Sequence, residues 1–303
     1  MRYIRNIIIG TLVVIISGVV FYSCAFTNTF LYDEGKSGTR DTLPIPKSRS
    51  GSSLDTLIKM GEFAKLIYTN KGVFADGAVA PDEPEFYGMN TMIQKQYQVR
   101  DNDYSYYVDQ ESYSDVSIIV FRGTANQQNY LDDINILRTD DRRLKLKLHS
   151  GFRKVASIMY GDIVKHYELD HKVILVGHSL GGAIAQIIGM WMDHIHNSEG
   201  VKRYDVQIFT FGSPKVSTTF IHNKPRHWRV IDKKDPVPFL PPYPYVHSGI
   251  VIDVNTLDWS ENHKEGSFTD TDSKDHSIKD YLDILYNQSD CDAKCRGSRE
   301  IRE

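Results

Sequence analysis

The segment that most constrains how this chain can fold is residues 173–190, VILVGHSLGGAIAQIIGM. Four consecutive aliphatic residues predict a strand buried on both faces, and the run after Gly182 has the composition of a helix. Ser179 lies between them with a glycine two residues to either side, a spacing that permits a sharp turn because no side chains collide there. Such a turn holds the hydroxyl out at a sheet edge, beside the N–H of Leu180. The segment predicts an α/β fold and a serine nucleophile; an ordinary glycine-rich turn is the alternative interpretation.

The length and composition limit the classes of protein to which this chain can belong. The 303 residues are enough for one α/β domain of roughly 230 to 250 residues with terminal extensions. A net charge of -3 does not indicate the excess of basic residues that nucleic-acid-binding proteins carry, so no nucleic-acid partner is expected. The three cysteines, at positions 24, 291 and 295, are too few for a zinc cluster or a disulfide framework. Whether Cys291 and Cys295 form a disulfide is left open.

The N-terminal region predicts attachment to a membrane. Residues 7–26, IIIGTLVVIISGVVFYSCAF, carry no charge and are long enough to span a bilayer as a helix. Arg2 and Arg5 precede this run, so the positive-inside rule predicts a cytoplasmic N-terminus with the rest of the chain on the far side. We therefore expect residues 1–26 to be a single-pass anchor or signal segment. Lipoprotein anchoring through Cys24 is an alternative, and a buried core helix is a less favoured one.

The domain boundaries follow from changes in composition. Residues 27–53 are rich in Gly, Ser, Thr and Pro and predict a flexible linker, 54–288 the folded domain, and 289–303 a polar tail. Apolar spacing predicts helices over 54–68, 148–160 and 275–286, and strands over 96–100, 105–108, 116–121, 206–211, 227–231 and 247–254.

The stretch 125–147 is polar and partly amphipathic. Tyr130, Leu131, Ile134 and Leu137 would lie on one face of a helix. We interpret the stretch either as a lid over the site or as a surface helix.

A serine nucleophile needs a base and a buried acid that orients the base. When the serine lies on a strand-to-helix turn, the acid and then the histidine follow it in the chain, on loops at the same sheet edge. Asp235 is the preferred acid because Pro236 fixes the loop after it. Asp232 is the alternative, although its place directly after the strand suits a turn cap.

Three later histidines are candidates for the base. His276 follows the last predicted strand at the start of the closing helix and is preferred. His247 is its main rival, and His263 lies in a polar loop. His178 is adjacent to Ser179, so it should point elsewhere and pack behind the turn.

The predicted strand 116–121 ends in Arg122-Gly123-Thr124. An oxyanion hole needs a second N–H from another loop at the same edge, and Thr124 can supply its amide and hydroxyl beside the amide of Leu180. A plain strand exit is the alternative interpretation.

Taken in order, these motifs resemble the landmarks of the class 3 lipases, the fungal-lipase-like branch of the α/β-hydrolases. They are FRGT at 121–124, HSGF at 149–152, GHSLGGA at 177–183, FGSPKV at 211–216, DPVP at 235–238 with LPP at 240–242, and DHS at 275–277. The resemblance spans about residues 54 to 286 and implies a mostly parallel central sheet flanked by helices. It also implies that Ser179 is the nucleophile, Asp235 the acid and His276 the base, with Thr124 and Leu180 as oxyanion donors and no cofactor or metal.

The expected function is therefore a membrane-attached serine carboxylester hydrolase, similar to a triacylglycerol lipase, that cleaves acyl-lipid substrates. Family members that act at oil surfaces have strongly apolar lids, whereas the corresponding stretch here has Tyr130 and several acids. Pronounced interfacial activation is for this reason not expected. A phospholipase A1 or short-chain esterase is the near alternative, and a catalytically silent, membrane-tethered binding module is the distant one.

Overall fold

The computed structural model describes residues 37–40, 43–46, 52–69, 94–99, 102–123, 137–198, 204–221, 225–261 and 273–300. The predicted membrane segment 7–26, most of the predicted lid, Thr124 and His263 lie outside these ranges. Within them, no helix combines the length and the hydropathy that a membrane crossing requires.

The centre of the sheet consists of parallel strands. In spatial order they are β4 (Val116–Phe121), β7 (Lys172–His178), β8 (Asp205–Phe211), β9 (Arg226–Ile231) and β10 (Ile250–Asp253). Parallel pairing puts the carboxyl ends of all these strands at one edge. The prediction of a mostly parallel central sheet is confirmed.

Antiparallel strands extend the sheet on both sides. β3 (Asn102–Asp109) and β2 (Gln94–Val99) follow β4, while β11 (Trp259–Ser260) and β1 (Ser37–Gly38) follow β10. In the described part of the chain this makes a nine-stranded sheet.

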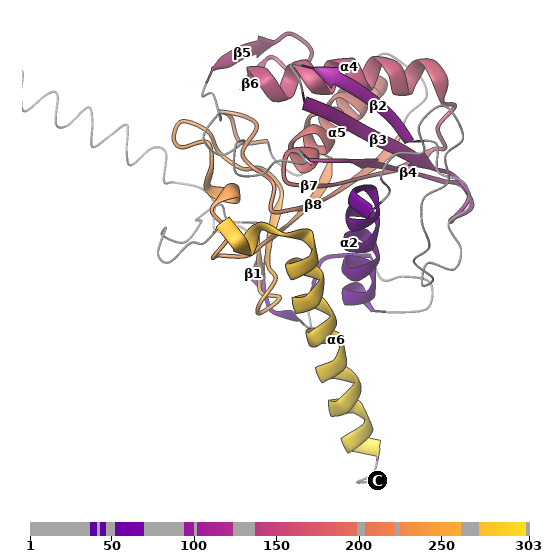
Figure 1. Ribbon diagram of the computed structural model, residues 1–303, viewed down its shortest axis with the longest axis vertical. Helices are drawn as coiled ribbons and strands as arrows, with labels where there is room; N and C mark the ends of the chain where they lie inside the picture. The colour runs from indigo at the N-terminus through magenta and orange to yellow at the C-terminus, as the bar shows by residue number, and fades with distance from the viewer. Residues whose placement is uncertain are drawn as a thin grey trace, which may run out of the picture. The chain divides into compact units, whose positions relative to one another are not determined.

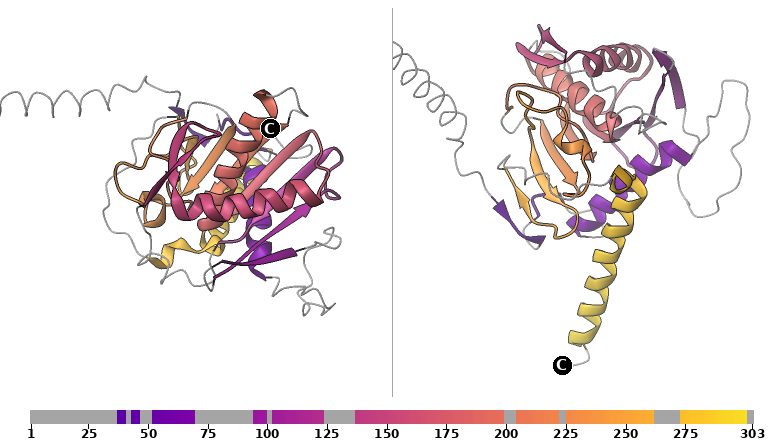
Figure 2. Two further views of the ribbon diagram at one scale, coloured as in Figure 1. Left: turned by 90° about the horizontal axis from the view of Figure 1, so that it is seen from above. Right: turned by 60° about the vertical axis from the view of Figure 1, so that its left-hand side comes forward.

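In the described part of the chain, helices cover both faces of the sheet, as Figures 1 and 2 show. α4 (Ser150–His166) and α5 (Leu180–Ser198) lie on one face, and α2 (Ser53–Thr69) and α6 (Ile278–Glu300) lie on the other. Short 3-10 helices occur at Val237–Phe239 and Ser273–His276.

Alternation along the strands divides the core in two. On β4, Ile119 and Phe121 pack in the cluster that contains α4 and α5, whereas Ile118 and Val120 pack in the cluster that contains α2 and α6. Successive side chains of a strand point to opposite faces, so an unbroken apolar strand is buried on both sides. This is why β7, with its consecutive aliphatic residues 173–176, has no polar face in the sequence.

The described part of the predicted linker 27–53 differs from the prediction. Ser37 and Gly38 pair with β11, and Ile45 is only 4% exposed, packed in the core beside α2. The strand predicted over 247–254 is shorter, at Ile250–Asp253, and β11 was not predicted at all. Strands of two residues carry no periodicity, so composition alone suggested a tether.

A hairpin replaces the helical pattern expected before residue 148. β5 (Arg138–Asp141) and β6 (Leu146–His149) form a separate antiparallel sheet, and α4 begins only at Ser150. The Asp141 carboxylate closes the turn by accepting hydrogen bonds from the backbone N–H groups of Arg143 and Leu144, both at 3.0 Å. The alternation LKLKL over 144–148 was the overlooked strand signal.

The C-terminal helix is longer than predicted. A loose tail was expected from residue 289, but the helical backbone of α6 continues to Glu300. The segment 287–300 contains no proline and a single glycine, so nothing in it breaks the helix. The side chains of Cys291 and Cys295 lie outside the described residues, and their pairing stays an open question.

Candidate active site

Ser179 lies at a strained turn between β7 and α5. Its backbone φ is +58°, in the left-handed region that non-glycine residues seldom adopt. A Cβ on Gly177 would lie 2.3 Å from backbone atoms of Gly181, and a Cβ on Gly181 would lie 2.1 Å from the carbonyl oxygen of Phe121. The glycines are therefore required by backbone contacts, as the sequence predicted for a sharp turn.

The structure brings Ser179, His276 and Asp235 together. His276 Nε2 lies 2.8 Å from Ser179 Oγ, and His276 Nδ1 lies 2.7 Å from Asp235 Oδ2. The three residues are 1%, 2% and 0% exposed. A carboxylate only accepts hydrogen bonds, so Nδ1 carries the proton and Nε2 can accept the one on the serine hydroxyl.

Asp235 is held by further donors. Its Oδ1 accepts from the backbone N–H of Val237 at 2.8 Å, and its Oδ2 also accepts from the Tyr281 hydroxyl at 2.8 Å. Burial raises the pKa of Tyr281 well above its usual value of 10, so the phenol keeps the proton that it donates. The same hydroxyl accepts from the backbone N–H of Asp232 at 2.9 Å. Tyr281 was not predicted to belong to the site: its spacing in α6 marked it only as a core residue.

The rival acid and base have other roles. Asp232 Oδ1 accepts from the backbone N–H of Lys234 at 3.0 Å and from Asn255 Nδ2 at 3.1 Å, so this carboxylate caps the turn. His247 is buried, with Nε2 2.6 Å from the carbonyl oxygen of Pro238. Burial, followed by the charge of a nearby arginine, lowers the pKa of His247 well below 6.5.

His178 packs directly behind the base. Its Nε2 lies 2.8 Å from the carbonyl oxygen of His276, and its Nδ1 lies 3.1 Å from the hydroxyl of Tyr68. That hydroxyl accepts the backbone N–H of Gly123 at 3.0 Å. Burial, and after it the neighbouring His276, lower the pKa of His178 well below 6.5, so the ring is neutral.

The proton positions in this chain of groups follow from the partners. A carbonyl oxygen only accepts, so Nε2 of His178 is the donor and Nδ1 accepts from Tyr68. The end of β4 is thereby connected to the backbone of His276 through the partly buried Tyr68 and the buried His178. Tyr68 closes the predicted first helix, but nothing in the sequence indicated that its hydroxyl reaches the site.

One of the two predicted oxyanion donors is described. Leu180 is the first residue of α5, where N–H groups have no partner within the helix and the helix dipole favours negative charge. Gly123, next to the predicted donor Thr124, uses its own N–H for Tyr68. The role of Thr124 stays a prediction.

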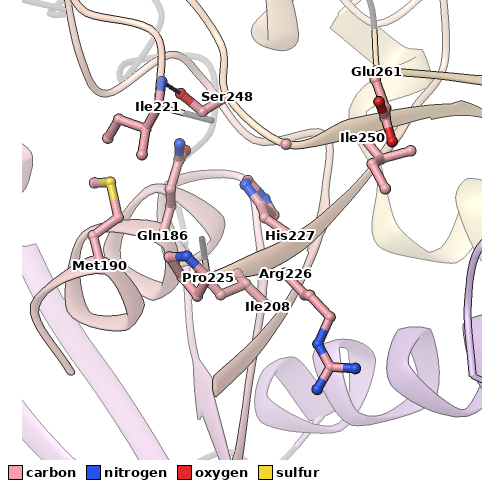
Figure 3. A pocket seen from close by; sticks show the side chains of 11 residues that line it. Gln186, Met190, Ile208, Ile221, Pro225, Arg226, His227, Ser248, Ile250 and Glu261 are labelled. Carbon is pink, nitrogen blue, oxygen red and sulfur yellow. Dashed lines mark hydrogen bonds between the residues drawn. The ribbon is translucent and has the colours of Figure 1, made fainter. Parts of the chain in front are cut away.

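A separate cavity of about 200 Å³ does not coincide with this site (Figure 3). Gln186, His227 and Ile250 are among its lining residues, and none of Ser179, Asp235 and His276 is. His227 and Ile250 lie near the starts of β9 and β10, whereas Asp235 follows the carboxyl end of β9. The cavity therefore belongs to the opposite edge of the sheet.

Comparison with known proteins agrees with the geometry. The described fold is similar to that of a nonglycosylated lipase from Yarrowia lipolytica, with a TM-score of 0.54 and 16% identity over 82% of this chain and 94% of that one. The fold is thus that of an α/β-hydrolase. Residues 118–245 match the family described as Lipase (class 3).

Curated proteins that are similar in sequence include two from fungi. The lipase of Rhizopus niveus is 32% identical over 146 residues, 44% of this chain and 37% of that protein. The secreted mono- and diacylglycerol lipase 1 of Fusarium solani is 28% identical over 137 residues, 41% of this chain and 39% of that protein. The chain thus spans less than two fifths of the length of these relatives.

Proposed function

We propose that this protein is a serine carboxylester hydrolase that cleaves fatty-acyl esters of glycerolipids. The observation that carries the proposal is the hydrogen-bonded series from Ser179 through His276 to Asp235, with distances of 2.8 and 2.7 Å, on a strained strand-to-helix turn. The names of the relatives, a lipase and a mono- and diacylglycerol lipase, support acylglycerols as substrates.

The geometry supports an acyl-enzyme mechanism. Ser179 Oγ attacks the ester carbonyl carbon while its proton passes to Nε2 of His276, and Asp235 stabilises the imidazolium that forms. The Leu180 N–H, with the predicted Thr124 donors, stabilises the oxyanion. His276 then gives the proton to the leaving alcohol. Water, deprotonated by the same histidine, releases the fatty acid and restores the serine.

The location of the protein is a separate proposal. The uncharged run 7–26 behind Arg2 and Arg5 supports a single membrane span with the N-terminus cytoplasmic and the catalytic domain on the far side. In that case the full chain stays with membranes washed at alkaline pH, and a chain without residues 1–26 is released. Retention that is lost in Cys24→Ser would instead favour the lipoprotein alternative.

A fluorophosphonate reagent tests the enzymatic function. The full chain in detergent should be labelled on a serine and should hydrolyse p-nitrophenyl butyrate. Ser179→Ala should lose the label, and its activity should fall by at least about 10³-fold. Ser248→Ala is the matched control, because this serine is also buried but bonds the backbone N–H of Ile221 near the other cavity. A folded chain that takes no label would favour the silent binding module.

A further inference from the structure

The hairpin β5–β6 carries positive charge on a chain that is acidic as a whole. Residues 138–149 contain five arginines and lysines and two aspartates, whereas the net charge of the chain is -3. The side chains of Arg138, Arg142, Lys145 and Lys147 are exposed. In Figure 1 the hairpin lies beside α4, far from the C-terminal end of α6.

One of the two aspartates does not reduce this charge at the surface. Asp141 is buried, and its Oδ2 accepts hydrogen bonds from Arg153 Nε at 2.8 Å and Trp191 Nε1 at 3.2 Å. The other, Asp140, lies 3.7 Å from Lys147, and both side chains are exposed. An exposed pair of this kind is weak and leaves both groups accessible.

An open groove of about 540 Å³ lies between this hairpin and the turn at Thr218 and Thr219. Three basic residues line it, Arg142, Lys145 and Lys147, together with the two threonines, Leu146 and the two aspartates, Asp140 and Asp141, of which the second is buried and bonded to Arg153. Ammonium, guanidinium and hydroxyl groups are the donors that bind phosphate oxygens. The chemistry of the groove therefore fits a phosphate group.

The groove is fixed in place by backbone hydrogen bonds. Thr218 N–H donates to the carbonyl oxygen of Lys147 at 3.2 Å, and His149 N–H donates to that of Val216 at 2.9 Å. Together with the buried Asp141, these bonds hold the cations on a rigid support, so binding does not have to order the backbone.

Two exposed apolar side chains lie on the segments joined to the hairpin. Leu137, directly before β5, is 59% exposed, and Tyr243 is 84% exposed. The hydroxyl of Tyr245 donates to the carbonyl oxygen of Leu137 at 3.2 Å, which ties the two segments together. The loop that carries Tyr243 follows the carboxyl end of β9 and contains Asp235, so it starts from the edge of the sheet where Ser179 lies.

We propose that the groove binds phosphate headgroups of an anionic bilayer, with Leu137 and Tyr243 against its apolar part. Hereafter this surface, Leu137, Arg142, Lys145, Lys147 and Tyr243, is the docking surface. A bilayer is favoured over another polyanion because exposed apolar side chains lie on the segments joined to the cationic hairpin. The inference rests on the proposed function in one respect, that a lipid hydrolase has to meet its substrate at a bilayer.

Vesicle binding tests the docking surface without depending on catalysis. The full chain carrying Ser179→Ala is placed in phosphatidylcholine nanodiscs, so that residues 7–26 are already in contact with lipid. Sucrose-loaded vesicles are then added and pelleted. We expect binding to vesicles in which one lipid in three is phosphatidylglycerol, none to pure phosphatidylcholine vesicles, and release by high salt.

Charge reversal should weaken binding specifically at the hairpin. Each basic residue near an anionic surface contributes about fivefold in affinity, so the double variant Arg142→Glu/Lys145→Glu should bind about 10²-fold more weakly or worse. Lys165→Glu/Lys279→Glu makes the same change in net charge at exposed positions outside the docking surface and should bind within about twofold of the parent. Tyr243→Ala should weaken binding several-fold.

Three results would overturn the proposal: equal loss in both double variants, no loss in either, or binding to polyuridylate in place of the vesicles. Hydrolysis by the chain with Ser179 restored is measured separately. Docking without hydrolysis would refute the proposed function but support the docking surface. Hydrolysis without docking would refute the docking surface but support the proposed function.

Discussion

Gly181→Ala is the sharpest test of the packing that forms the turn. A Cβ at this position would lie 2.1 Å from the carbonyl oxygen of Phe121 and 2.9 Å from the carbonyl carbon of Arg122, whereas ordinary contact begins at 3.4 Å. The atoms in the way are backbone atoms of β4, which cannot rotate aside as a side chain does. The start of α5 would therefore have to move away from β4 by more than 1 Å.

The expected cost follows from this displacement. Overpacking of a rigid site costs about 3 kcal/mol at the upper end of the usual range, and the helix preference of alanine over glycine offsets about 1 kcal/mol. The remaining loss of about 2 kcal/mol should lower the melting temperature by roughly 4 to 8 °C. Because α5 carries the Leu180 N–H, a shift of about 1 Å should also reduce ester hydrolysis about 10²-fold.

Gly161→Ala is the matched control. Gly161 is an exposed position in α4, and a Cβ there would meet nothing within 4 Å. This substitution should stabilise the protein by up to about 1 kcal/mol and leave hydrolysis of p-nitrophenyl butyrate unchanged. Melting curves and initial rates measure both variants. If Gly181→Ala melted and hydrolysed like the control, the close approach of α5 to β4 would be wrong.

Three further predictions concern buried polar groups. Asp235→Asn should lower kcat by about 10³- to 10⁴-fold with little change in KM, while Asp232→Asn stays within about tenfold; comparable losses in steady-state kinetics would contradict the assignment of the acid. Tyr68→Phe should lower the free energy of unfolding, measured in urea, by about 1 to 3 kcal/mol, because His178 loses its hydrogen-bond donor. The substitution should also lower kcat while KM changes less. An unchanged kcat would show that Tyr68 does not support the site. The pKa values of His178 and His247 are lowered by burial in the folded protein, so below about pH 6.5 the unfolded chain takes up protons that the folded chain does not. The free energy of unfolding should therefore be constant above about pH 6.5 and fall by up to about 2.7 kcal/mol per pH unit below it. An unfolding free energy that does not change between pH 7 and pH 5 would refute this.

The sequence predicted the centre of the fold well, for reasons of chemistry. A strand buried on both faces must be continuously apolar, and a serine on a strand-to-helix turn restricts where its partners can come from. These constraints selected Ser179, Asp235 and His276, which the structure brings together, although their catalytic role is still a prediction.

What the sequence did not predict depends on contacts between distant segments. Tyr68 and Tyr281 lie at ordinary core positions of their helices, and only the tertiary fold shows that their hydroxyls contact His178 and Asp235. The strands at Ser37–Gly38 and Trp259–Ser260 are too short to have a period, so their pairing with each other could not be read from either one.

The packing of α2 against α6 has a consequence for fragments of this chain. Leu282 lies against Gly61, and the hydroxyl of Tyr286 donates to Glu62 at 3.0 Å, so α2 and α6 support one another. The family segment 118–245 contains Ser179 and Asp235 but not His276 or Tyr68. A fragment cut at those limits would retain the nucleophile and the acid without the base. Hydrolysis should therefore vanish in that fragment, and activity can serve as a measure of whether the segment that carries His276 is intact.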